Sequence, residues 1–291
     1  MQLGWGDWSA EIAPARGGAL LRLDWRGAPV LRPARGPSML DVACFPLVPF
    51  SNRIANGRFV FEGQAVSLPA NLAAEGEPHA IHGLGWQSAW QIEEAGAARA
   101  VWSHRHTGGA WPWRYRATQS LRPVGAALEL ALTLTNDSDR TMPAGLGFHP
   151  YFPRTPRTVY HGLHRCEWQR GADRLPCNPC ESAVPRDWWQ GRPVETRARD
   201  TIYAGRAGPL TIAWPERGLT LVLTPAPALD FTVIYTPAGA DFFCVEPVSH
   251  LTDAHNRPGG DNGLWHLLPG ESRSVAVTFA MMDRASEAKT L

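Results

Sequence analysis

The sequence predicts an all-β fold built as one large β-sandwich, and three observations lead to this prediction. Short segments in which apolar and polar residues alternate recur along the chain, which is the pattern of strands with one buried face. The 26 prolines and 28 glycines interrupt the chain so often that no helix of three turns is expected. The 44% of hydrophobic residues are enough to build a large core.

The expected strands follow one another along the chain. Apolar and polar residues alternate in residues 58–68 (RFVFEGQAVSL) and in residues 274–282 (SVAVTFAMM). Residues 127–136 (ALELALTLTN) place four leucines on one face. Residues 210–225 contain two alternating runs around a Pro-Glu-Arg-Gly turn, which predicts a hairpin. Residues 153–200 are the least regular and contain several prolines, so a long excursion over the surface is expected there.

Composition limits the classes of function. No linker or compositional shift divides the 291 residues, so a single domain over 1–291 is expected. The net charge of +1 and the absence of charge runs argue against nucleic-acid or membrane partners. No secretory leader is recognised, and five cysteines are few for this length, so a cytoplasmic monomer or homodimer is expected. The only lysine, Lys289, lies near the C-terminus, which argues against Schiff-base chemistry.

The sequence lacks GxGxxG, GxxxxGK[ST], HExxH and GxSxG, which argues against nucleotide cofactors, zinc proteolysis and serine hydrolysis. No cofactor is therefore expected. One segment, 161–180, holds enough ligands for tetrahedral zinc. Only half of it has the regular spacing of a zinc knuckle, so scattered loop residues are the favoured interpretation and no metal is expected. The candidate ligands are His161, His164, Cys166, Cys177 and Cys180.

Aromatic residues alternate in the segment 109–121, where Trp111, Trp113 and Tyr115 are expected on one side of a strand. Aromatic residues on strands usually belong to the core, and that is the interpretation favoured here. One or two exposed rings could instead stack on a sugar.

Polar groups stand out against apolar surroundings at four places. Asn52 and Arg53 lie between hydrophobic runs, and His82 precedes a glycine that lets the backbone approach a ligand closely. His149 and Glu246 are each expected at the tip of an apolar strand that a proline ends. Two titratable groups in such surroundings form a plausible acid–base pair, although satisfied structural groups remain the alternative.

The stretches that carry these residues, taken in order, resemble the aldose 1-epimerase (galactose mutarotase) family. The matching pieces are PFSNRIANGRFVFEG, HAIHGLGWQSAW, GGAWPWRYRATQSL, GLGFHPYF, FTVIYTP and FCVEP. The likeness spans about residues 17–280. It implies a large antiparallel β-supersandwich with an open sugar-binding cleft and a small-molecule sugar substrate, and a mechanism without metal or organic cofactor.

The resemblance also implies roles for residues. Glu246 would take the proton from the C1 hydroxyl of a cyclic aldose while His149 protonates the ring oxygen. The ring would open, turn about the C1–C2 bond and close as the other anomer. His82 would contact the region of the ring oxygen, and Asn52 and Arg53 would bind sugar hydroxyls.

Asp200 falls where family members carry a sugar-binding aspartate. Several positions depart from the family pattern and leave the preferred sugar open. Leu84 follows Gly83 where HGG is common, Pro153 and Arg154 replace Asn-Leu, and Val233 replaces a frequent glutamine.

Two alternatives remain open beside the mutarotase of free aldoses. A hexose 6-phosphate mutarotase would need several arginines at the cleft, and no cleft motif carries more than one in an obvious place. A non-catalytic carbohydrate-binding β-sandwich would have no need for the paired acid and base of His149 and Glu246.

Overall fold

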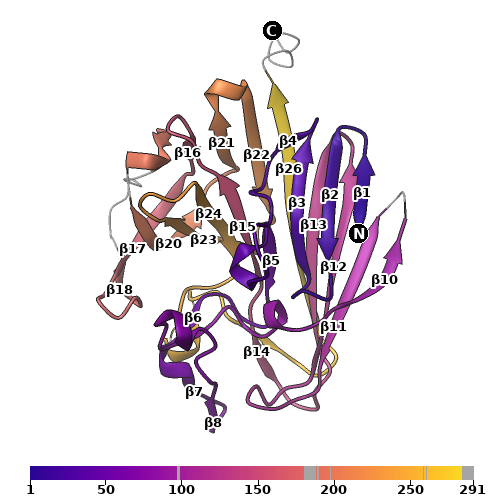
Figure 1. The fold of residues 1–291 in the computed structure, drawn as a ribbon. Helices are drawn as coiled ribbons and strands as arrows, with labels where there is room; N and C mark the ends of the chain where they lie inside the picture. The colour runs from indigo at the N-terminus through magenta and orange to yellow at the C-terminus, as the bar shows by residue number, and fades with distance from the viewer. Residues whose placement is uncertain are drawn as a thin grey trace.

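Two large antiparallel β-sheets dominate the structure, a computed structural model that describes residues 1–96, 99–179, 188, 190–196, 198–257, 259 and 261–283 (Figure 1). In the described residues the first sheet has 11 strands. In spatial order they are β1 (Gln2–Trp5), β2 (Trp8–Ala13), β3 (Ala19–Trp25), β5 (Cys44–Leu47), β15 (Gly147–Pro153), β24 (Phe242–Val248), β23 (Phe231–Thr236), β20 (Arg199–Arg206), β17 (His164–Arg170) and β18 (Pro176–Pro179), with β4 (Ala28–Pro29) beside β3.

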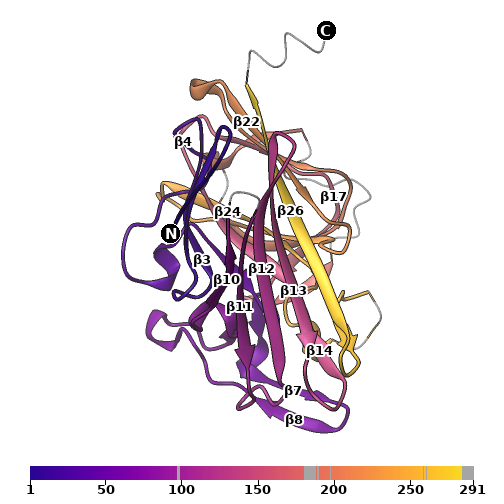
Figure 2. The same cartoon turned by 90° about the vertical axis from the view of Figure 1, so that its right-hand side faces the viewer.

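The second sheet covers the other side of the core, and its long strands face the viewer in Figure 2. Its described strands are, in order, β10 (Gln91–Ala95), β11 (Ala100–His106), β12 (Tyr115–Val124), β13 (Ala127–Asn136), β26 (Ser272–Asp283), β22 (Leu219–Pro225), β21 (Leu210–Trp214), β16 (Val159–His161) and β19 (Arg192–Pro193). The all-β sandwich expected from the alternation is thereby confirmed.

Small elements complete the described chain. Three strand pairs are β6 (Arg53–Ile54) with β9 (Ala80–Ile81), β7 (Arg58–Phe61) with β8 (Gln64–Ser67), and β14 (Met142–Ala144) with β25 (Trp265–Leu267). The helical elements in the described residues are single 3₁₀ turns: η1 (Met39–Asp41), η2 (Ala55–Gly57), η3 (Ala73–Glu75), η4 (Gly85–Gln87), η5 (Val194–Thr196), η6 (Pro215–Arg217) and η7 (Ala254–Asn256). None of the helices in this part of the chain is long and apolar enough to cross a membrane.

The alternation that predicted the strands also selects the residues of the core. The four leucines of β13 are fully buried, while the residues between them are partly exposed. They belong to the cluster that fills the space between the sheets. Trp111, Trp113 and Tyr115 are buried as well, which confirms the core interpretation, but β12 begins only at Tyr115.

The expectation of a long surface excursion over residues 153–200 was wrong. Within 153–200 the described residues form β16 to β19 and the start of β20, which extend both sheets, rather than a surface excursion. Among the described prolines of this segment, Pro153 ends β15, Pro156 lies in a turn, and the others lie in β18 and β19 at the sheet edges, where a missing N–H donor is tolerated.

Buried histidines give the fold a predictable pH dependence. Burial lowers the pKa of each of six histidines below 6.5, to about 3 for His149 and His164 and to about 4 for His250. The same cause lowers the pKa of the half-buried His104 and holds the pKa of His82 and His255 well below the usual value.

The stability of the protein should therefore decrease between pH 7 and pH 5. Below pH 6.5 the unfolded chain binds protons that the folded state excludes, so stability is lost as the pH falls, with a slope that approaches ~1.4 kcal/mol per pH unit for each histidine. Burial raises the pKa of Glu246, so this carboxyl opposes the trend, but it is one group against six histidines. Urea denaturation at pH 7, 6 and 5 measures the effect, and equal free energies of unfolding across that range would contradict it.

Candidate functional site

The floor of the site is formed by neighbouring strands in the middle of the first sheet. Strand β15 pairs His149 with Phe45 of β5 on one side. On its other side, the register that pairs Gly147 with Val248 and Tyr151 with Cys244 places His149 opposite Glu246 of β24. His149 Nε2 and Glu246 Oε1 lie 3.3 Å apart, so the sheet brings together the two residues predicted as acid and base.

The position of this pair within its strands differs from the expectation. His149 and Glu246 lie inside β15 and β24, which continue through Pro150 and Pro247, and not at strand tips. Proline lacks a donor but has an extended backbone, so it interrupts a ladder without ending a strand. The ladder between β15 and β24 indeed has no partners between the pairs of Gly147 and Tyr151.

Aromatic rings fix the orientation of His149. The Phe45 ring stacks on the imidazole with centroids 4.5 Å apart, and Tyr151 packs against it at 4.7 Å. His82 meets the imidazole edge-on at 5.0 Å and 90°. The histidine thus has little freedom, which is what a positioned proton-transfer group requires.

Burial sets the proton affinity of both groups. It lowers the pKa of His149 to about 3, and the charge of Arg32 lowers it further. Burial raises the pKa of Glu246 well above its usual value, with Asp200 adding to the effect and Arg53 opposing it. Both shifts favour a neutral imidazole beside a protonated carboxyl, so the pair holds one titratable proton, which lies on Glu246. Among the described residues, His149 Nδ1 and Glu246 Oε2 have no hydrogen-bond partner.

Potential metal ligands occur at the same place. Donor atoms of His149, Cys244 and Glu246 lie within 4.8 Å of one another, and such a donor set could hold zinc. Burial raises the pKa of the Cys244 thiol well above its usual value, which disfavours the thiolate that binds a metal. Among the described residues of 161–180 no such group forms, and Cys180 lies outside the described residues.

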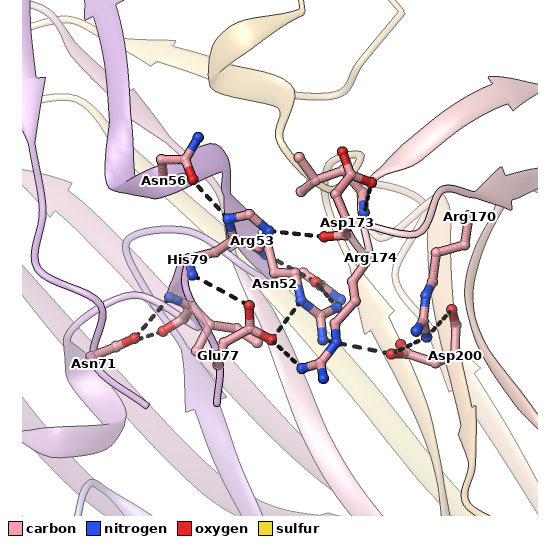
Figure 3. Close-up of polar contacts among 12 residues, drawn as sticks. Asn52, Arg53, Asn56, Asn71, Glu77, His79, Arg170, Asp173, Arg174 and Asp200 are labelled. Atoms are coloured by element: carbon pink, nitrogen blue, oxygen red, sulfur yellow. Dashed lines mark hydrogen bonds and ion pairs between the residues drawn. The ribbon is translucent and has the colours of Figure 1, made fainter. Parts of the chain in front are cut away.

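Asn52 and Arg53 form one wall of the site, where β6 begins (Figure 3). Asn52 has a left-handed backbone with φ of 53°, and its side-chain oxygen accepts from the backbone N–H of Arg53 at 2.9 Å and from Arg53 Nη1 at 3.2 Å. Arg53 Nε donates to Glu77 Oε2 at 3.0 Å, and Arg53 Nη2 lies 3.6 Å from Asp200 Oδ2. The arginine is thereby fixed between two carboxylates.

Asp200 enters the site from β20, where it pairs with Tyr235 of β23. Its Oδ2 accepts from Arg170 Nη1 at 2.5 Å, while Arg174 Nη1 donates to Glu77 Oε2 at 3.2 Å (Figure 3). Burial alone would raise the pKa of Glu77, but the charges and hydrogen bonds of Arg53 and Arg174 outweigh it and hold that pKa below the usual value. The network joins segments from three parts of the chain.

The turn that carries His82 depends on a close backbone approach. His82 and Gly83 have positive φ angles of 64° and 71°, and the His82 N–H donates to the Asn52 carbonyl at 2.9 Å. A Cβ at Gly83 would lie 2.2 Å from the carbonyl oxygen of Val48. Glycine is therefore required there for space as well as for conformation.

Gly83→Ala should destabilise the fold more than Gly63→Ala. Both glycines have positive φ, but a Cβ at Gly63 meets nothing within 4 Å. Strain alone costs about 1 kcal/mol, and displacing the backbone at Gly83 should add about 1–3 kcal/mol. Urea denaturation of the two variants measures the difference. Equal losses would contradict the close approach to Val48.

The six predicted site residues all line one cavity of about 570 Å³: Asn52, Arg53, His82, His149, Asp200 and Glu246. Sequence reasoning missed other members, above all Arg32, Arg170, Arg174 and the buried partner Glu77. The cleft motifs contribute a single arginine to the cavity, Arg53, as the sequence indicated. Three further arginines, Arg32, Arg170 and Arg174, come from outside those motifs, so four arginines line the cleft. The cavity is large enough for a single sugar ring.

Comparisons with known proteins agree on one family. A family model described as aldose 1-epimerase matches residues 7–280. The uncharacterized protein YphB of Escherichia coli is 34% identical over 272 residues, which cover 90% of this chain and 92% of YphB.

Solved structures give the same result. A crystal structure of a candidate aldose 1-epimerase from Escherichia coli superposes with a TM-score of 0.89 at 30% identity, covering 97% of this chain and 98% of that one. A galactose mutarotase-like protein from Clostridium acetobutylicum has a TM-score of 0.86 at 18% identity, with 97% and 94% covered, and shows that the fold is shared.

Proposed function

Because this chain belongs to the aldose 1-epimerase family, we propose that it interconverts the α and β anomers of an aldose through acid–base catalysis by His149 and Glu246. The observation that supports the proposal best is the 3.3 Å contact between His149 Nε2 and Glu246 Oε1 on the floor of the cavity. The hydroxyl oxygen O1 and the ring oxygen O5 of a cyclic aldose are both bonded to C1. Two adjacent catalytic groups can therefore reach both oxygens at once.

In the proposed reaction, the Glu246 carboxylate takes the proton of the O1 hydroxyl. Electrons of the O1–H bond form the C1=O1 double bond, the C1–O5 bond breaks, and O5 takes a proton from the His149 imidazolium. The open aldehyde turns about C1–C2. Closure on the other face then reverses both proton transfers and releases the second anomer.

The proton balance of the pair suits this sequence. Ring opening converts a carboxylate and an imidazolium into a carboxylic acid and a neutral imidazole. These neutral forms are the ones that burial favours for Glu246 and His149. The apolar floor would therefore stabilise the proton distribution of the open-chain stage, and ring closure, which reverses both proton transfers, would restore the carboxylate and the imidazolium.

The polar wall would hold the rest of the sugar. Asn52, Arg53 and Asp200 present amide, guanidinium and carboxylate groups to the cavity, which can donate to and accept from hydroxyls. The ion pairs of Arg53 with Glu77 and Asp200 preorganise these groups before a sugar binds. We place this activity in the cytoplasm, as the few cysteines indicate.

A second candidate, a mutarotase for charged aldoses such as hexose 6-phosphates, is favoured by the four arginines in the cleft. The chemistry at C1 and O5 would be the same. A carbohydrate-binding sandwich without turnover is disfavoured, because a binding module gains nothing from a desolvated carboxyl against a desolvated imidazole, and such burial is costly.

Polarimetry tests the proposal directly. Freshly dissolved α-glucose, α-galactose and α-xylose should each be followed with and without the protein, and the uncatalysed rate subtracted. Acceleration of at least one aldose is expected. If neither these sugars nor their charged derivatives are accelerated, the proposed activity is wrong, and saturable binding without acceleration would favour the non-catalytic alternative.

A further inference from the structure

The charges of three cleft arginines are already compensated by the protein. Arg53 lies 3.0 Å from a Glu77 oxygen and 3.6 Å from an Asp200 oxygen. Arg170 lies 2.5 Å from Asp200 and Arg174 lies 3.2 Å from Glu77. Two carboxylates thus serve three guanidinium groups, and Figure 3 shows these residues joined in one network.

The fourth cleft arginine, Arg32, is different. It is only 4% exposed, yet among the described residues no carboxylate oxygen lies within 4.0 Å of its nitrogens, and its Nε has no partner. Its Nη2 donates to the carbonyl oxygens of Leu40 and Val42, both at 3.0 Å. These carbonyls satisfy donors but leave the positive charge without a counter-charge.

Aromatic rings hold the guanidinium in place. Its Cζ lies 4.3 Å from the centroid of the Tyr151 ring and 4.6 Å from that of Phe242. Such stacking positions a planar cation rigidly and leaves its edge available to a ligand. Burial lowers the pKa of Arg32, and the groups that oppose this shift are Tyr151, Cys244 and, with the smallest effect, Asp41, which also lines the cavity. A rigid buried cation on a ligand cavity is suited to an anion.

The position of Arg32 indicates which part of a sugar it would meet. The Tyr151 ring that packs on Arg32 also packs on His149, with centroids 4.7 Å apart. In the proposed reaction His149 serves the ring oxygen O5. The exocyclic carbon C6 is attached to C5, the carbon on the side of O5 away from C1, so a C6 substituent lies beside the histidine.

We propose that Arg32 is a specificity-determining residue that binds an anionic group on C6 of the substrate, so that the preferred substrates are uronic acids or hexose 6-phosphates rather than neutral aldoses. This inference rests on the proposed function and names the substrate class of the same site. Carboxylate and phosphate share the chemistry that Arg32 recognises, a compact anion with two or more acceptor oxygens.

Two measurements on the whole protein test the proposal. The first compares kcat/KM for the anomerisation of glucose, glucuronate and glucose 6-phosphate, followed by exchange NMR. The second measures the Kd of the same three compounds by calorimetry, which needs no turnover. We expect at least one anionic sugar to exceed glucose by about 10- to 100-fold in both, and the better of the two identifies the preferred anion.

Variants assign the preference to its residue. Arg32→Gln should reduce the ratio of kcat/KM for the anionic sugar to kcat/KM for glucose by at least about tenfold. Arg32→Lys keeps the charge without the planar fork and should retain part of the preference for the anionic sugar. Arg35→Gln is the matched control, because Arg35 is exposed, pairs with Asp241 and does not line the cavity, so its ratio should equal that of the wild type.

The outcomes separate this inference from the proposed function. Acceleration of glucose equal to or greater than that of both anionic sugars would overturn the role of Arg32 and leave the mutarotase standing. Tighter binding of an anionic sugar without any acceleration would support Arg32 and overturn the mutarotase. If Arg32→Gln does not fold, the wild-type ratios and Arg32→Lys still decide, because equal affinities for glucose, glucuronate and glucose 6-phosphate would refute the inference.

Discussion

Glu246→Gln is expected to lower kcat/KM for anomerisation by about 10²–10⁴-fold, the contribution of one positioned general base. Glutamine has the size of glutamate but cannot take the O1 proton. The oxygen 3.3 Å from His149 would also become part of an amide, so the pair could no longer share its proton. Polarimetry of the best substrate at pH 7 measures the effect.

The control for this variant is Glu216→Gln. Glu216 is a partly exposed glutamate that pairs with Arg217 and does not line the cavity, so its loss should leave the rate nearly unchanged. The folded state raises the pKa of Glu246, so this carboxyl stabilises the fold fully below pH 4.5, and its contribution is lost as the pH rises through the folded-state pKa. Glu246→Gln should therefore be at least as stable as the wild type at pH 7. Full activity in Glu246→Gln would exclude Glu246 as the base.

Arg53→Met should destabilise the fold by about 3 kcal/mol, because it leaves buried carboxylates with less compensation. The Arg53 side chain is 10% exposed and that of Glu77 is 5% exposed. Methionine keeps the apolar stem but removes the charge between Glu77 and Asp200. Arg170 and Arg174 retain their own contacts with these carboxylates and limit the loss. Urea denaturation at pH 7 measures it.

A double variant separates charge from packing. Glu77→Gln added to Arg53→Met should recover part of the lost stability, since the carboxylate that needs compensation is then absent. Arg122→Met provides the comparison at the surface, where the pair with Glu129 should contribute less than about 1 kcal/mol. If Arg53→Met costs no more than Arg122→Met, the buried network does not stabilise the fold as described.

Local patterns in the sequence predicted the sandwich well. The alternation of leucines in 127–136 and the turn in 210–225 reappear as β13 and as the hairpin of β21 and β22. Each is a short-range signal, because a strand with one buried face repeats every two residues. Proline was the misleading signal at His149 and Glu246. Its missing N–H suggested strand ends, whereas the strands continue through it.

The rest of the site depends on contacts between distant segments. Nothing near Arg32 or Glu77 in the sequence distinguishes these residues from surface charges, and an arginine is more often exposed than buried. The role of Arg32 arises because it packs on the Tyr151 ring of β15, which also packs on His149, and the role of Glu77 arises because Arg53 and Arg174 pair with it. Alternation fixes which face a residue occupies but not which strand lies beside it.

The location of His149 and Glu246 inside paired strands has a consequence for how such a protein can diversify. The distance between the two groups follows from strand spacing and register, which insertions in surface loops leave unchanged. Arg32 and Arg174 lie outside the strands of the first sheet and can vary separately. Directed evolution toward a new sugar should therefore randomise these wall positions and keep β15 and β24 fixed, so that most library members retain the chemistry while recognition changes.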